Sequence, residues 1–398
     1  MKKILDFLAL KRGIMTILLM VVFVEMGEKM GERFLPIFII ALGGNAIIVG
    51  LLNAMDNFLG AAYSFPGGYL SDKIGYKKSL MFFNIAAMVG YLIVIIFPYW
   101  QTALIGAALF ISWSSVSLPA VMSAISKVLP DKKRTMGVTM HSLVRRLPMA
   151  LGPIMGGLCI TRWGEINGIR AAFLFSFTLT FIAVFIQYFL LEEVKTTPAT
   201  LINPFKVLNK AGPALKHLLI SDILIRFCEQ IPYAFVVIWI VKNLNHSPIA
   251  FGLLTTVEMV TAVLIYIPVA YLVEKNKEKK PYIAITFGFF SIFPLALMFS
   301  KSTTALVLVF IIRGLKEFGE PTRKALILDL SPEENKGQVY GAYYLVRDAI
   351  VAVSAFSGGI LWMYSPYLNF VTAFVFGVLG TVYFMLYCEE KRPEGHIP

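Results

Sequence analysis

The composition of this 398-residue chain excludes an ordinary soluble protein, because 58% of its residues are hydrophobic, only 15% are charged, and its mean hydropathy is +0.74. Its formal net charge of +12 does not indicate a nucleic-acid partner, because the basic residues are spread over many loops instead of gathering on one soluble face. We therefore expect a membrane protein surrounded by a lipid bilayer.

Long apolar segments recur along the whole chain. A helix of about 20 residues crosses the hydrocarbon core of a bilayer, and twelve segments reach that length. The first six are residues 14–41, 47–71, 79–98, 101–127, 137–162 and 168–191. The second six are residues 216–243, 249–273, 281–300, 303–329, 337–363 and 368–388. The sequence therefore predicts an all-α membrane protein with twelve transmembrane helices.

The second six segments repeat the first six at a constant offset of 202 residues. At this offset Pro66, for example, aligns with Pro268, so the chain contains two six-helix repeats that run in the same direction. We expect an N-terminal six-helix bundle over residues 1–191, a cytoplasmic linker over residues 192–215, and a C-terminal six-helix bundle over residues 216–398.

Basic residues mark the loops that face the cytoplasm. Most of them precede the first span or follow the even-numbered spans, whereas the alternate loops hold little more than Arg162, Lys242 and Lys301. The positive-inside rule then places both termini in the cytoplasm. We expect a multi-pass protein of the cell membrane, that is, a plasma or inner membrane.

The sequence shows no pattern of a metal or cofactor site. Cys159, Cys228 and Cys388 fall within predicted spans without paired spacing, the four histidines lack ligand spacing, and no phosphate-binding glycine motif occurs. The loops are also too short for a soluble catalytic domain. We expect no cofactor, no metal, no nucleic-acid partner and no enzymatic activity, and instead a monomer that binds a small-molecule solute and protons.

The connection between the second and third spans carries the most specific motif. It reads Gly68-Tyr69-Leu70-Ser71-Asp72-Lys73-Ile74-Gly75-Tyr76-Lys77-Lys78, which resembles the loop signature G-x-L-x-D-[RK]-x-G-[RK]-[RK]-[RK] of the major facilitator superfamily, apart from Tyr76. Gly75 suits a tight turn between two helices. Asp72 is free to meet a helix N-terminus or a basic partner at the cytoplasmic gate.

This resemblance implies a fold and a mechanism. Members of the superfamily have two six-helix halves that expose a central site alternately to the two sides of the membrane. The residues that the resemblance assigns to gating are Gly68, Asp72, Lys73, Gly75, Lys77, Lys78 and Glu274, the last being the repeat equivalent of Asp72.

A second motif lies in the fifth span, where Gly152-Pro153-Ile154-Met155-Gly156-Gly157 resembles the end of a signature associated with proton-coupled exporters of the superfamily. Thr139 and Pro148 replace its earlier glycines. The motif favours export by proton antiport, while close helix packing explains the same small residues equally well.

Ionisable residues within the predicted spans are candidates for proton coupling, because a charge near the bilayer centre costs about 2.5 to 3.5 kcal/mol. Glu25, Glu28 and Glu32 share one stripe of the first helix with Lys29 and Arg33. A second pair of acids, Asp56 and Glu258, aligns across the repeat. We expect proton coupling at these five acids, and internal salt bridges are the alternative.

Candidate solute contacts follow from the chemistry of arginine, whose planar guanidinium suits a carboxylate or phosphate. Arg145 and its repeat equivalent Arg347 lie within predicted spans. Arg313 lies in the tenth span. Its repeat equivalent in the fourth span is Ile111, where members of the family often have an arginine. We add Trp113 and Glu229 as lining residues. Pairing of Arg145 and Arg347 with cavity acids or loop carbonyls is an equal alternative.

A further resemblance concerns the first span. Glu25-Met26-Gly27-Glu28-Lys29 resembles the ExxER element of proton-coupled peptide transporters, with Lys in place of Arg and without the Tyr-Tyr-Gly that follows there.

Together these patterns predict a proton-coupled secondary active transporter that moves a small charged or amphiphilic organic solute by alternating access, with export by proton antiport favoured. The alternative within transport is proton-coupled uptake of an organic anion or a peptide. A membrane receptor that does not transport and a membrane enzyme are the distant alternatives.

Overall fold

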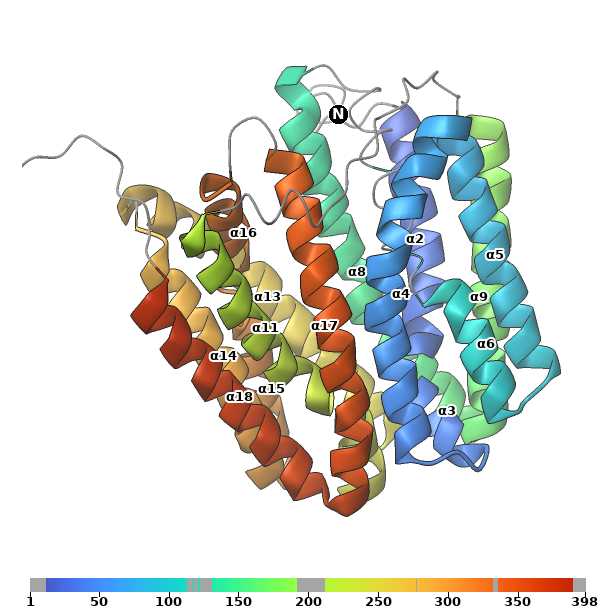
Figure 1. Ribbon diagram of the computed structural model, residues 1–398. Helices are drawn as coiled ribbons and strands as arrows, with labels where there is room; N and C mark the ends of the chain where they lie inside the picture. Colours follow the sequence, from blue (N-terminus) through green and yellow to red (C-terminus); the bar gives the residue numbers. More distant parts are fainter. Residues whose placement is uncertain are drawn as a thin grey trace, which may run out of the picture. The chain divides into compact units, whose positions relative to one another are not determined.

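The computed structural model describes residues 12–111, 113, 117, 121, 131–191, 212–276, 278–331 and 336–388. Some of these, chiefly residues 12–14, 64–72 and 131–140, are described by their backbone alone. The described chain is helical apart from short turns and has no strand (Figure 1). Most of the expected linker, residues 192–211, lies outside the described residues.

The chain folds into two compact units, which are described separately. Unit 1 comprises Met1–Thr200 together with Ala234–Met259, and unit 2 comprises Leu201–Tyr233 together with Val260–Pro398. The expected bundle boundaries at residues 191 and 216 stay predictions.

Unit 1 is built from the helices of the first repeat and from one segment of the second. Its helices are α2 (Arg12–Glu32), α3 (Leu35–Ala41), α4 (Ala46–Ile74), α5 (Tyr76–Ile96), α6 (Trp100–Phe110), α8 (Asp131–Trp163) and α9 (Glu165–Leu190). The added segment holds α12 (Phe235–Ile238), the π-helix η1 (Trp239–Asn243) and the first part of α13 (Pro248–Asn276). Helix α2 packs against both α8 and α9, and α5 packs against α6 and α9.

Unit 2 repeats the same arrangement of neighbours. Its helices are α11 (Pro213–Tyr233), the rest of α13, α14 (Lys280–Phe299), α15 (Thr303–Leu315), α16 (Glu320–Asp329), α17 (Lys336–Tyr364) and α18 (Pro366–Tyr387). Here α11 packs against α17 and α18, and α14 packs against α15 and α18. The repeat-related helices therefore have the same partners in both units, as a duplication predicts.

Eight helical segments of the described chain are long and apolar enough to cross a membrane. They match eight of the twelve predicted spans. The first span instead breaks at Arg33–Phe34 into α2 and α3, and the tenth breaks at residues 316–319 into α15 and α16. The fifth span forms α8, which is less apolar, and much of the fourth lies outside the described residues. The count of twelve therefore stays a prediction.

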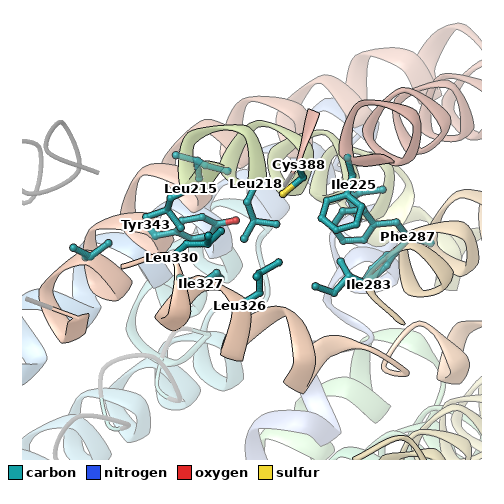
Figure 2. Close-up of a cluster of buried hydrophobic side chains, with 14 residues drawn as sticks. Leu215, Leu218, Ile225, Ile283, Phe287, Leu326, Ile327, Leu330, Tyr343 and Cys388 are labelled. Carbon is teal, nitrogen blue, oxygen red and sulfur yellow. The ribbon is translucent and has the colours of Figure 1, made fainter. Parts of the chain in front are cut away.

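The core of unit 2 contains a cluster of buried apolar side chains from five segments (Figure 2). Leu218 and Ile225 come from α11, Phe287 from α14, Leu326 from α16 and Tyr343 from α17. Tyr343 also donates a hydrogen bond from its hydroxyl to a carboxylate oxygen of α11. The apolar core of unit 2 therefore adjoins a cluster of charged side chains.

Candidate functional site

The acids of the first span lie inside unit 1. Glu25, Glu28, Lys29 and Glu32 of α2 are all buried, and none is more than 9% exposed. They are buried because α2 is covered by α8 and α9. The approach of α8 is close, since a Cβ at Gly152 would lie 2.7 Å from the Cβ of Lys29.

Two cations pair with the three acids of this stripe. Lys29 donates from Nζ to Glu28 Oε1 at 3.1 Å and also pairs with Glu32. From α8, Arg145 places Nε 2.5 Å from Glu25 Oε1. Arg145, a predicted solute contact, is therefore joined to a predicted proton carrier by an ion pair.

Among the acids of α2, two have one carboxylate oxygen without a donor. Glu25 Oε2 and Glu28 Oε2 are buried and have no hydrogen-bond partner among the described residues. An ionised carboxylate ordinarily accepts several hydrogen bonds, and a buried acceptor without a donor is costly. These two oxygens are therefore the part of the acidic stripe that the described residues leave without a donor.

The acids of unit 2 have a different environment. Asp222 Oδ2 accepts hydrogen bonds from Arg323, from Tyr343 at 3.1 Å and from Arg347 at 3.3 Å. Both oxygens of Glu320 accept from Arg323, at 2.6 and 3.0 Å. Fixed ion pairs of this kind are typical of a structural network.

Glu229, a predicted solute contact, belongs to the same network. Its Oε1 accepts from Lys316 at 2.7 Å and its Oε2 from Arg226 at 2.5 Å. Both carboxylate oxygens are therefore occupied by side chains of unit 2. Arg323 joins α16 to α11 through its pair with Asp222, and it pairs with Glu320 within α16.

The remaining predicted solute arginines lie against aromatic rings. Arg313 is buried on α15, and its guanidinium carbon is 5.1 Å from the ring centre of Phe293 and 5.4 Å from that of Phe310. Arg347 lies 4.2 Å from the ring centre of Tyr344 and pairs with Asp348 at 2.7 Å. Cation–π contacts lower the cost of burying a guanidinium.

Trp113 takes part in a buried hydrogen-bond chain in unit 1. Its Nε1 donates to Asn84 Oδ1 at 2.8 Å, Asn84 donates to Gln187 Oε1 at 2.9 Å, and Gln187 donates to the carbonyl oxygen of Lys77 at 2.7 Å. The indole N–H of Trp113, a predicted solute contact, therefore donates its hydrogen bond to a side chain of unit 1. Sequence patterns did not indicate Asn84 or Gln187, although a lone amide side chain within an apolar span was an available signal.

The gating motif is described in part. Gly75 has φ 91°, a left-handed conformation between α4 and α5, which confirms the expected tight turn. Lys77 donates from Nζ to the carbonyl oxygen of Tyr188 at 2.9 Å, and Lys73 and Lys78 are exposed. The environments of Gly68, Asp72 and Glu274 lie outside what is described.

The last predicted pair of acids lies in unit 1. Asp56 is half-buried on α4, and Glu258 is buried on α13. Both take part in polar or electrostatic contacts. In the residues described, no group of three or more His, Cys, Asp or Glu side chains is placed to hold a metal ion.

The small residues of the fifth-span motif bring α8 close to its neighbours. A Cβ at Gly156 would lie 2.1 Å from the carbonyl oxygen of Met30 on α2, and one at Gly157 would lie 2.7 Å from that of Pro248. Close packing therefore accounts for these glycines without reference to transport direction.

A repeated helical fold with helices long and apolar enough to span a membrane, and with charges buried within both repeats, is typical of polytopic membrane transport proteins. The model of the Major Facilitator Superfamily matches the chain over residues 17–228 and again over residues 218–398. The chain belongs to the major facilitator superfamily, and it is a multi-pass membrane transporter.

Its relatives agree with this assignment. The uncharacterized MFS-type transporter MJ1317 of Methanocaldococcus jannaschii is 24% identical over 377 residues, which cover 89% of this chain and 90% of that protein. The uncharacterized MFS-type transporter YqjV of Bacillus subtilis is 27% identical over 147 residues, 35% of each chain.

Solved structures share the fold at low sequence identity. The peptide transporter POT in complex with sulfate has a TM-score of 0.77 at 15% identity, covering 94% of this chain and 93% of that one. The human organic anion transporter MFSD10 (TETRAN) has a TM-score of 0.64 at 13% identity, covering 94% and 99%. A bacterial homolog of the human lysosomal transporter Spinster, inward-facing and unoccupied, has a TM-score of 0.71 at 11% identity, covering 94% and 97%.

Proposed function

We propose that this protein is a proton-coupled secondary active transporter of a small charged or amphiphilic organic solute. The observation that carries the proposal is the contrast between the two units. In unit 1, Glu25 and Glu28 each keep one buried oxygen without a hydrogen-bond donor among the described residues. In unit 2, both oxygens of Glu229 and Glu320 are occupied by cations. Exchangeable protons belong where carboxylates are incompletely paired.

The ion pair between Arg145 and Glu25 supplies a route for coupling. An anionic or zwitterionic solute that binds Arg145 competes with the Glu25 carboxylate for the same guanidinium, which lies 2.5 Å away. A proton on Glu25 removes that competitor. Solute binding and proton binding therefore influence each other through one charged pair, and linkage requires the influence to be reciprocal.

Lys29 extends the coupling along α2. It pairs with both Glu28 and Glu32, so a proton on one acid strengthens the hold of Lys29 on the other. Arg33 lies within electrostatic reach of Glu32. Protonation of Glu25 therefore takes place next to acids whose cations, Lys29 on α2 and Arg33 directly after it, can change partners.

Two directions of transport remain candidates. The fifth-span motif favours export by proton antiport, the direction that the sequence supports. Uptake of an organic anion or a peptide by proton symport is the second candidate. The likeness of the fold to a peptide transporter and to a human organic anion transporter supports these two solute classes. Antiport moves the proton and the solute in opposite directions across the membrane, whereas symport moves them in the same direction.

The test is transport in reconstituted vesicles with an imposed pH gradient. A panel of peptides, organic carboxylates, organic phosphates and cationic amphiphiles is offered while external pH and solute content are recorded together. We expect at least one solute to accumulate in step with proton movement. Movement of proton and solute in opposite directions identifies antiport, and movement of both in the same direction identifies symport. Solute binding without flux indicates a receptor, and the absence of proton-linked flux across the panel refutes the proposal.

A further inference from the structure

Three buried oxygen atoms from three helices of unit 1 lack a hydrogen-bond partner within the described part of the chain. They are Glu28 Oε2 on α2, Tyr91 Oη on α5 and Thr180 Oγ1 on α9. All three side chains are 0% exposed. A buried polar atom without a partner costs free energy, so three in one region require a physical explanation.

Packing brings the three groups to one place. Helices α2 and α9 are in close contact at Gly27, whose carbonyl oxygen accepts a hydrogen bond from Ser176 Oγ at 2.6 Å. Thr180 follows Ser176 by one helical turn on the same face of α9. The side chain of Glu28 is directed toward the N-terminal end of α2, as helical side chains are.

Aromatic rings fix the position of the third group. The ring of Tyr91 lies 4.9 Å from that of Phe110 and 5.7 Å from that of Phe173, centre to centre. Its hydroxyl lies within hydrogen-bonding reach of the Thr180 hydroxyl and within electrostatic reach of Glu28, whereas the open oxygen of Glu28 has no donor among the described residues. The hydroxyl therefore cannot turn to another partner without displacing a packed ring.

The chemistry of the three atoms suits one ligand. A water molecule needs two to four polar partners, and it can donate to the carboxylate oxygen while it accepts from the hydroxyls. A cation is disfavoured because the ammonium of Lys29 lies 3.1 Å from the other oxygen of Glu28. The charged groups near Glu28 are Lys29, Glu25 and Glu32 on α2, and Arg145 reaches the stripe from α8.

We propose that Glu28, Tyr91 and Thr180 bind a buried water molecule within unit 1, and that this water supplies the missing hydrogen bond to Glu28. The water site rests on the three side chains alone. Its consequence for proton coupling rests on the proposed function. Tyr91 and Thr180 are then positioning residues, because they act on the proton site through the water.

X-ray radiolytic footprinting tests the site, because radicals formed from a bound water oxidise the side chains next to it. Tyr343 is the matched control, since it is also 0% exposed but its hydroxyl is bonded directly to Asp222 at 3.1 Å. We expect Tyr91 in the whole, detergent-solubilised protein to be oxidised several times faster than Tyr343. Thr180→Val should lower the rate at Tyr91 severalfold. Equal rates for the two tyrosines, or no effect of Thr180→Val, would overturn the proposal.

A transport measurement tests the consequence separately. Loss of a donor to the Glu28 carboxylate should move the half-maximal pH of proton-coupled flux upward in Tyr91→Phe and in Thr180→Val. Tyr364→Phe, which removes an exposed hydroxyl, should leave the pH profile unchanged. A positive footprint with no proton flux in the wild-type protein refutes the proposed function and leaves the water site standing. A positive footprint with unshifted profiles in both variants refutes the coupling role.

Discussion

Replacing Arg323 with methionine removes the central cation of the charged network in unit 2. The guanidinium is 1% exposed, pairs with Asp222, and donates to Glu320 at 2.6 and 3.0 Å. Methionine keeps much of the volume of the side chain but none of its donors. The substitution therefore leaves two buried carboxylates without their main partner.

The magnitude follows from what the two acids retain. Removing one partner of a buried ion pair costs about 3 to 5 kcal/mol. Asp222 keeps the hydroxyl of Tyr343 and the guanidinium of Arg347, at 3.1 and 3.3 Å, and Glu320 keeps Arg226 at 3.5 Å. These remaining contacts place the expected loss near the lower limit, at about 3 kcal/mol.

The assay is reversible unfolding of the purified protein in mixed detergent micelles, followed by tryptophan fluorescence. Lys324→Met is the matched control, because Lys324 approaches the same Glu320 at 3.5 Å while its side chain is 46% exposed. An exposed pair of this kind is worth about 1 kcal/mol or less. If Arg323→Met destabilises the protein no more than Lys324→Met does, the network is not the structural element described above.

Three further outcomes are expected in the same unfolding assay. Gly156→Ala should lower the free energy of unfolding by about 1 to 3 kcal/mol, because the added Cβ would lie 2.1 Å from the α2 backbone. The control Gly288→Ala, whose Cβ would meet nothing within 4 Å, should be neutral or slightly stabilising. Equal effects of the two substitutions would contradict the close approach of α8 to α2. Asn84→Leu should cost about 2 to 4 kcal/mol, because it leaves the indole nitrogen of Trp113 and the amide oxygen of Gln187 unpaired in a buried hydrogen-bond chain. A change below about 1 kcal/mol would show that this chain does not stabilise the packing of unit 1. Lys242→Ala should change stability by less than about 1 kcal/mol, because its pair with an acid of α9 is exposed, and a larger loss would mean that this pair is more than a surface contact.

The sequence predicted the helical segments better than the breaks within them. Hydropathy identifies an apolar segment but does not register a local end of a helix. In the first span, α2 ends and α3 begins with Pro36 in its first turn. In the tenth span, α15 ends and α16 begins with Pro321 in its first turn. Proline lacks a backbone donor and is tolerated in a first turn, but it disrupts a helix interior. These prolines were a usable signal.

The charged residues were also found by sequence, but their partners were not. Arg145 pairs with Glu25, and Glu229 pairs with Lys316, which directly follows α15. Such pairs join residues about a hundred positions apart, and they depend on how the helices pack. The periodicity of a single helix therefore identified the polar stripe of α2 but could not separate a saturated acid from one with an open oxygen.

We propose that the incompletely paired acids Glu25 and Glu28 exchange the coupled proton, and Glu28, whose open oxygen also carries the water site, is the one whose replacement tests this. Reconstituted Glu28→Gln should still exchange labelled solute across the vesicle membrane when pH is equal on both sides, because the amide keeps the shape of the side chain. It should fail to accumulate solute when a pH gradient is imposed. Accumulation by Glu28→Gln with the proton-to-solute ratio of the wild-type protein would contradict the account.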